Sequence, residues 1–191
     1  MVDLGPAGPG GRGSPDPGPT PAARLLIDAF GRVSESVEAV LDGLDGPQLT
    51  ARPAADANPI AWLVWHLTRI QDDHLAGAFG HEQVWTAGGW HERFGLPFDA
   101  GATGYGQDAE EVGAVRVGGD LLRDYHRAVF ERTRRSLEAM PEHELERVVD
   151  ERWDPPVTLG VRLISVVADD LEHAGQAAYV RGLLERGGSR G

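Results

Sequence analysis

The stretch NPIAWLVWHLTRIQDDHL, residues 58–75, decides the fold of this chain. Asn58 before Pro59 is typical of a helix start, because asparagine caps free backbone N–H groups and proline needs none in the first turn. Apolar residues then recur at three- and four-residue spacing up to Leu75, as on the buried face of an amphipathic helix. We expect this helix to end at Gly80.

Three further helices follow from similar signals on either side. Thr20 and Pro21 mark the start of the first, Pro141 follows the end of the third, and Thr158 caps the fourth. Their apolar residues keep the helical period, and no segment has a convincing strand pattern. The expected ranges are 21–44, 120–140 and 158–186, with connections over 45–57, 81–119 and 142–157. The sequence therefore predicts an all-α, antiparallel four-helix bundle with a long irregular connection between helices two and three.

Composition limits the classes of partner. The chain has 191 residues, of which 41% are hydrophobic, enough for one domain over 21–187 after a Gly- and Pro-rich, disordered extension over 1–20. Acidic residues outnumber basic ones by 30 to 18, and the formal net charge of -12 repels nucleic acids and anionic membrane surfaces. The N-terminus lacks the apolar core of a signal peptide, and no apolar run is long enough to cross a bilayer, so we expect a cytoplasmic protein.

Two missing residue types limit the chemistry. The chain has no cysteine, and all its basic residues are arginine. Disulfides, protein thiolates and Schiff-base lysines are therefore excluded. Any metal must be bound through nitrogen and oxygen.

The expected fourth helix has a spacing suited to metal binding. Asp169 and His173 are one turn apart and only about 40° apart around the helix, so both side chains can reach one ion. Asp170 is also near His173, but it points toward the apolar side of the helix, which makes Asp169 the better partner. A solvated acid and histidine pair at this spacing is the open alternative.

His66 lies in the most apolar stretch of the chain, where an imidazole without a partner is costly. If the helices that contain His66 and His173 pack side by side, a His-carboxylate-His set forms with open positions for water or substrate. The alternative is a core histidine bonded to a backbone carbonyl. Among the other histidines, His74 is a pocket or core residue. Those at positions 81, 91, 126 and 143 are expected in solvent.

The segments 58–74 and 169–182, with Gly104-Tyr105-Gly106 between them, resemble the DinB-like superfamily, especially its thiol-dependent S-transferase branch. That branch includes mycothiol-dependent maleylpyruvate isomerase. The resemblance implies a four-helix bundle with a metal bound by His66, Asp169 and His173. The family usually has histidine or glutamate at position 169, and the shorter aspartate leaves open whether the carboxylate binds the metal directly.

The function that the resemblance implies is conjugation of a low-molecular-weight thiol, mycothiol, to an electrophilic small molecule, as in detoxification. The metal would supply the thiolate that the protein lacks, and two imidazoles with one carboxylate suit zinc, with nickel, cobalt or manganese as alternatives. Arg162 and Arg181 are expected to bind acidic parts of the thiol, with a role as surface arginines as the open alternative. Trp85, Trp90 and Tyr105 are expected to wall a substrate pocket. A non-catalytic bundle, a thiol-independent metal hydrolase and a homodimer stay open.

Overall fold

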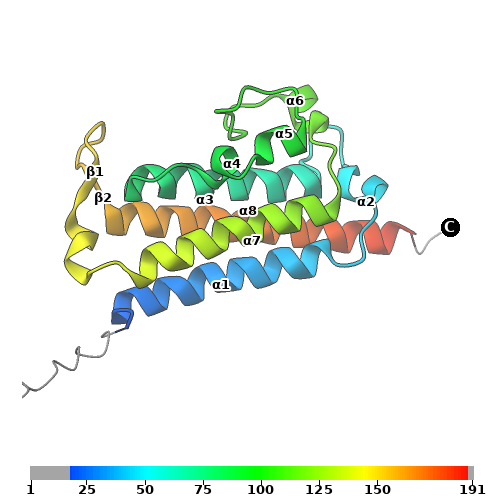
Figure 1. Ribbon diagram of the computed structural model, residues 1–191. Coiled ribbons are helices and arrows are strands. Elements are labelled where there is room, and N and C mark those ends of the chain that lie inside the picture. The colour runs from blue at the N-terminus through cyan, green and yellow to red at the C-terminus, as the bar shows by residue number, and fades with distance from the viewer. Residues whose placement is uncertain (1–17, 189–191) are drawn as a thin grey trace, which may run out of the picture.

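The structure is a computed structural model that describes residues 18–188, and it is built mainly from four long helices (Figure 1). The long helices are α1 (Pro21–Leu41), α3 (Ile60–Phe79), α7 (Gly119–Glu138) and α8 (Leu159–Gly188). The shorter elements are α2 (Gly46–Thr50), α4 (Val84–Ala87), α5 (Trp90–Phe94), α6 (Ala109–Ala114), the 3-10 helix η1 (Glu142–Glu146), and strands β1 (Val148–Asp150) and β2 (Val157–Thr158). Most of the extension expected over 1–20 lies outside the described residues.

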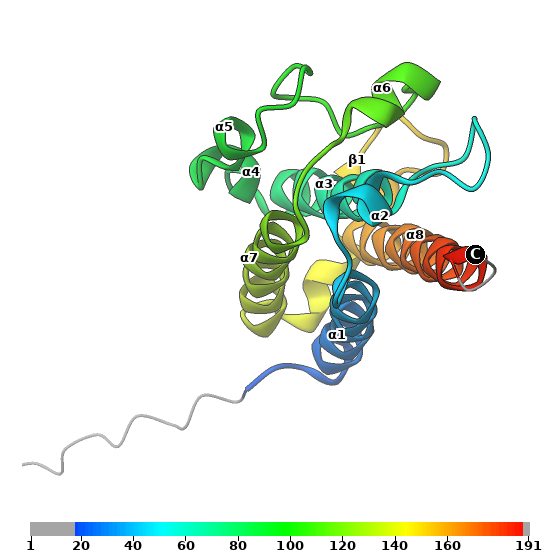
Figure 2. The same ribbon diagram turned by 90° about the vertical axis from the view of Figure 1, so that its right-hand side faces the viewer.

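The four long helices form the expected bundle. Both α1 and α3 pack against α7 and α8, so the helices occupy the four corners of a square when viewed along the bundle (Figure 2). The short helices α4, α5 and α6 lie outside this square, beside α3 and the start of α7. The predicted all-α, DinB-like fold is confirmed.

The antiparallel arrangement holds for two of the neighbouring pairs, α1 with α7 and α3 with α8 (Figure 1). Helices α3 and α7 instead run parallel: Thr68 meets His126, and Gln71 meets Thr133 one to two turns further along both helices. The long connection after α3 explains this direction, because it returns the chain to the end of the bundle where α3 began.

The helix starts follow the expected chemistry with one exception. The Thr20 hydroxyl oxygen accepts a hydrogen bond from the Ala23 amide at 3.1 Å, and Thr158 does the same for Val161 at 3.4 Å. The cap of α3 is Pro59 without a side-chain bond, so the prediction that Asn58 caps this helix was wrong.

Two connections contain more regular structure than expected. Asp45 and Gln48 form a capping box that starts the short helix α2, with Pro47 in its first turn, where proline costs no hydrogen bond. The prediction of no strand was also wrong, because β1 and β2 pair as a short antiparallel hairpin. Strands of two and three residues are too short to show a sequence period.

The connection between α3 and α7 is anchored by two buried charges on α3. The Asp72 carboxylate accepts hydrogen bonds from the amides of Val84 and Trp85, both at 2.8 Å. The Arg69 guanidinium, fully buried, donates to the Ala102 carbonyl at 3.1 Å and lies 3.7 Å from Asp72. These contacts hold the connection against the face of α3.

Burial corrects two predictions. Trp85 and Trp90 pack with Phe94 around Tyr125 in the core instead of walling a substrate pocket, and only Tyr105 of the expected three aromatics is exposed. His126, expected in solvent, is 1% exposed; its Nδ1 lies 3.1 Å from the Thr68 hydroxyl. No helix in the described range 18–188 combines the length and apolar character of a membrane span.

Candidate metal centre

His66 faces the seam between α3 and α8, where the loop 102–107 covers it. Its Nδ1 lies 2.7 Å from the Thr103 carbonyl oxygen, and because a carbonyl can only accept, Nδ1 bears the proton. The ring stacks on Trp62 one turn earlier, with centroids 4.5 Å apart and planes 11° apart. Only 6% of His66 is exposed, so these contacts fix an imidazole whose Nε2 lone pair is available to a metal.

Gly104 permits this close approach of the loop. Its φ of +96° is unfavourable for other residues, and a Cβ atom at this position would lie 2.7 Å from the Nδ1 of His66. On the other side, the Trp62 indole N–H donates to Gln107 at 2.7 Å. In the segment Gly104-Tyr105-Gly106, the first glycine is therefore the residue that allows the loop to lie directly against His66.

Helix α8 presents the other two side chains. His173 Nε2 lies 3.7 Å from the Asp169 carboxylate, and the His173 Nδ1 lies 3.2 Å from the Gln176 amide oxygen. The rings of His66 and His173 lie 4.7 Å apart at an interplanar angle of 79°. Each of the three residues offers one ligand atom, and these atoms lie within 4.8 Å of one another. We call this set the His-Asp-His triad.

The triad fits a divalent cation. Oδ2 of Asp169 is buried and has no hydrogen-bond partner among the described residues, an arrangement that is costly unless a cation or water completes it. Burial lowers the pKa of His66, with a further lowering from His173, against opposing contributions from Thr103 and Asp169. A neutral His66 keeps its lone pair for a metal. Two nitrogens and one oxygen suit zinc and leave further positions open.

The structure separates the neighbouring acids of α8. Asp170 is completely buried on the core side of the helix, and burial raises its pKa well above the usual range, with Asp169 adding to the shift. A neutral acid in the core is a poor metal ligand. Asp169 is thus the carboxylate that α8 brings to His173, as its angular position on the helix predicted.

The two arginines expected to bind the thiol lie apart from the triad and already have partners. Arg181 donates to the carbonyl oxygens of Ala39, Val40 and Asp42 at the end of α1, at 2.6 to 2.9 Å. Arg162 lies 3.2 Å from His74 and 3.0 Å from Asp150. Their role in thiol binding stays a prediction.

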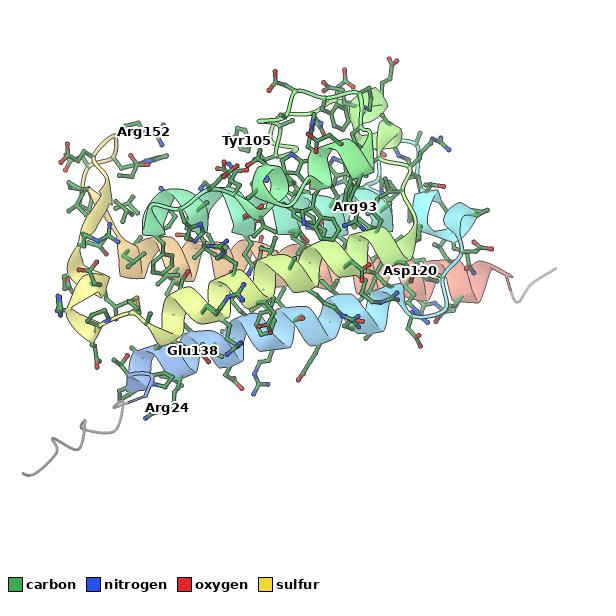
Figure 3. The ribbon with its side chains drawn as sticks, in the orientation of Figure 1. Arg24, Arg93, Tyr105, Asp120, Glu138 and Arg152 are labelled. Carbon is green, nitrogen blue, oxygen red and sulfur yellow. The ribbon has the colours of Figure 1, made fainter. Side chains whose placement is uncertain are left out.

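A cavity of about 830 Å³ lies further along α3 than the triad, between that helix, the hairpin and the start of the connection. Arg162 and His74 line it. Figure 3 shows Arg152 on the hairpin and Tyr105 on the loop over α3, on the same side of the bundle. This cavity and the triad therefore occupy different stretches of the same helix pair.

Sequence comparison with known proteins assigns the chain to a family. A profile described as Mycothiol-S-transferase matches residues 25–186, most of the described structure. The chain belongs to the mycothiol S-transferase family. This assignment confirms the resemblance drawn from the segments around His66 and His173.

A solved structure shares the fold of this mycothiol S-transferase family member. It is a crystal structure of a conserved protein from Enterococcus faecalis, 31% identical, with a TM-score of 0.78 over 83% of this chain and 94% of that chain. A search of curated proteins found no match. The family assignment supports involvement of a metal and of mycothiol, and the individual roles of the triad residues stay predictions.

Sequence reasoning missed the groups that orient the triad. The Thr103 carbonyl and the Gln176 amide each hold one ring nitrogen of a histidine. The contact of Gln176 could have been predicted from the sequence, because Gln176 lies three residues after His173 on the same helix. The contact of Thr103 could not, because a backbone carbonyl is present at every position and only the folded loop selects it.

Proposed function

We propose that this protein is a metal-dependent thiol S-transferase that conjugates mycothiol to an electrophilic small molecule. The observation that supports it is the His-Asp-His triad, whose ligand atoms converge from two packed helices in a chain of the mycothiol S-transferase family. The open positions that three protein ligands leave are typical of catalytic rather than structural sites.

The triad would hold one divalent cation, with zinc as the best fit. When bound, such a cation lowers the pKa of a thiol enough to keep it deprotonated near neutral pH. The chain itself supplies no thiol, so the nucleophilic sulfur must come from the cofactor. In the reaction, the thiol releases its proton to solvent, a sulfur–carbon bond forms, and the leaving group departs with its electron pair.

The protein's own residues orient the ligands and limit water. Thr103 fixes the proton of His66 on Nδ1, and Gln176 acts in the same way on His173. Trp62 and the loop 102–107 cover the His66 ring, leaving it 6% exposed. Asp169 contributes the negative charge that offsets a cation, because its buried Oδ2 has no other partner among the described residues.

Metal analysis of wild type beside His173→Ala tests the triad. We expect one equivalent of metal in wild type and less than about a tenth of that in the variant, because two ligands hold a divalent ion far more weakly than three. His143→Ala is the matched control, since His143 is 79% exposed and lies in η1. Equal metal content in wild type and His173→Ala would contradict the proposal that the triad binds the metal.

Thiol conjugation tests the reaction. With chlorodinitrobenzene as electrophile, we expect release of chloride that depends on both mycothiol and metal and is lost in His173→Ala. Turnover without added thiol would instead support a hydrolase. A folded protein that binds no metal and shows no turnover would support a non-catalytic bundle. We place the protein in the cytoplasm, where the thiol and its electrophiles would meet it.

A further inference from the structure

The cavity beside the triad has a polar lining that the proposed chemistry does not use. Asp73 contributes to it from α3, seven residues after His66 and on almost the same face, which places it about 10 Å along the helix axis. Asp169 lies close enough to His74 to interact electrostatically with its imidazole. The cavity therefore lies on the same face of α3 as His66 and about 10 Å further along the helix, within reach of a ligand whose other end lies at the triad.

Arg162 fixes the protonation state of His74 in this cavity. Its Nη1 lies 3.2 Å from the His74 Nδ1, and because a guanidinium can only donate, Nδ1 must accept. The proton of the neutral ring is then on Nε2, which has no hydrogen-bond partner among the described residues. Burial lowers the pKa of His74, and Arg162 lowers it further, against Asp73 and Asp169. His74 thus presents one N–H donor to the cavity.

The hairpin holds Arg162 in place. The Nη2 atom of Arg162 donates to Asp150 at 3.0 Å, and the side chain is only 17% exposed. Arg152 binds both oxygens of Asp150, at 2.9 and 2.8 Å, and these bonds hold the pKa of that carboxyl well below its usual range. Asp150 of the hairpin thus holds Arg162, and Arg162 in turn holds the His74 ring with its Nε2–H toward the cavity.

The lining selects against anionic and apolar ligands. Its four carboxylates outnumber its two guanidiniums, so it repels anions, and both guanidiniums are already bound to Asp150. Val149 is its largest apolar side chain. A neutral ligand with many hydroxyl groups fits this surface, because hydroxyls accept from His74 and donate to the carboxylate oxygens of Glu82 and Glu151, which have no hydrogen-bond partner among the described residues.

We infer that this cavity binds the sugar part of mycothiol, the glucosamine–inositol glycoside, and that His74 donates its Nε2–H to an oxygen of that glycoside. The inference rests on the proposed function for the position of the sulfur. The sulfur and the inositol lie at opposite ends of mycothiol, so one molecule reaches from the triad into the cavity. His74 is then a residue that selects the thiol.

Binding of the sulfur-free glycoside tests the inference without turnover. The probe is N-acetylglucosaminyl-inositol, in which the sugar nitrogen is a neutral amide, titrated into metal-free wild type, His74→Phe, His74→Gln and His143→Phe, with calorimetry and imidazole nitrogen NMR as readouts. We expect binding to wild type, a His74 resonance of the Nε2–H form that shifts on binding, and about tenfold weaker binding to His74→Phe. His74→Gln, whose amide keeps a donor near the Nε2 position, and the surface control His143→Phe should bind nearly as wild type does. Equal binding to all four proteins, or none to wild type, would overturn the inference.

Kinetics with two thiols separate this inference from the proposed function. In His74→Phe we expect the KM for mycothiol to rise about tenfold. The KM for N-acetylcysteine methylamide, a neutral thiol without the sugar, should stay unchanged. A rise for both thiols, or for chlorodinitrobenzene alone, assigns His74 to another role and overturns the inference. Glycoside binding without thiol-dependent turnover in wild type would contradict the proposed function and leave the sugar site supported.

Discussion

Gly104 is the residue at which the loop and the metal ligand are closest. We expect Gly104→Ala to weaken metal binding about 10- to 100-fold, because the added Cβ displaces the Thr103 carbonyl that orients His66. The measurement is metal affinity by competition with a chelator. Gly106→Ala is the matched control: its φ is also positive, at +75°, but nothing lies within 4 Å of the added atom. Equal weakening in both variants would show that backbone strain alone is responsible.

His126 makes stability depend on pH. Burial lowers its pKa from 6.5 to about 4, so the unfolded chain takes up the proton first as the pH falls. The contribution of this histidine to stability is therefore complete above about pH 6.5 and is lost as the pH falls toward about 4. We expect wild type to lose about 2 kcal/mol more than His126→Asn between about pH 7 and about pH 5, measured by urea unfolding. A constant difference between the two proteins across this range would contradict the shift.

The triad shows which parts of a site a sequence reveals. Asp169 and His173 were predictable because one helix turn relates them, and His66 because a polar ring is conspicuous in an apolar helix. The orienting carbonyl of Thr103 was not, because its position depends on where a loop from another part of the chain comes to lie. His126 was misjudged because its helix face seemed polar, although a hydrogen bond to Thr68 permits its burial.

At the scale of elements, Arg181 of α8 completes the end of α1. Helix α1 has no basic residue in its last turn, and the Arg181 guanidinium supplies donors to the three carbonyls there. We expect Arg181→Met to lower the free energy of unfolding by about 1–3 kcal/mol, measured in urea. Arg116→Met is the control, since Arg116 is exposed and has no hydrogen-bond or ion-pair partner among the described residues. An unchanged stability with a raised KM for mycothiol would favour the thiol-binding role instead.

The long helices were predictable and the short elements were not. Apolar residues at a 3.6-residue period run over many turns in α1, α3, α7 and α8, and such long patterns have few alternative explanations. A hairpin of a few residues and the single-turn α4 are too short to show a period. Trp85 was assigned to a pocket because aromatic residues in a long loop are common in binding sites, yet the loop folds back and buries it beside Tyr125.

At the scale of the whole molecule, metal binding is linked to folding. We expect zinc at about 100 times its Kd to stabilise the protein by about 2.7 kcal/mol, because the folded chain alone brings the three ligands together. For a chain of this size the melting temperature should rise by about 5–10 °C. Differential scanning calorimetry with and without chelator measures this shift. His66→Ala should show none, and a full shift in that variant would place the ion elsewhere.

The anchoring of the connection to α3 affects how this protein can diversify. Asp72 binds the backbone amides of Val84 and Trp85, early in the connection. Arg69 binds the backbone carbonyl of Ala102, the residue before Thr103. Backbone amides and carbonyls survive almost any change of side chain. The exposed residues within 86–99, unlike the buried Trp90 and Phe94, can therefore be exchanged among relatives to suit new electrophiles while the same two charges keep the imidazole of α3 in register.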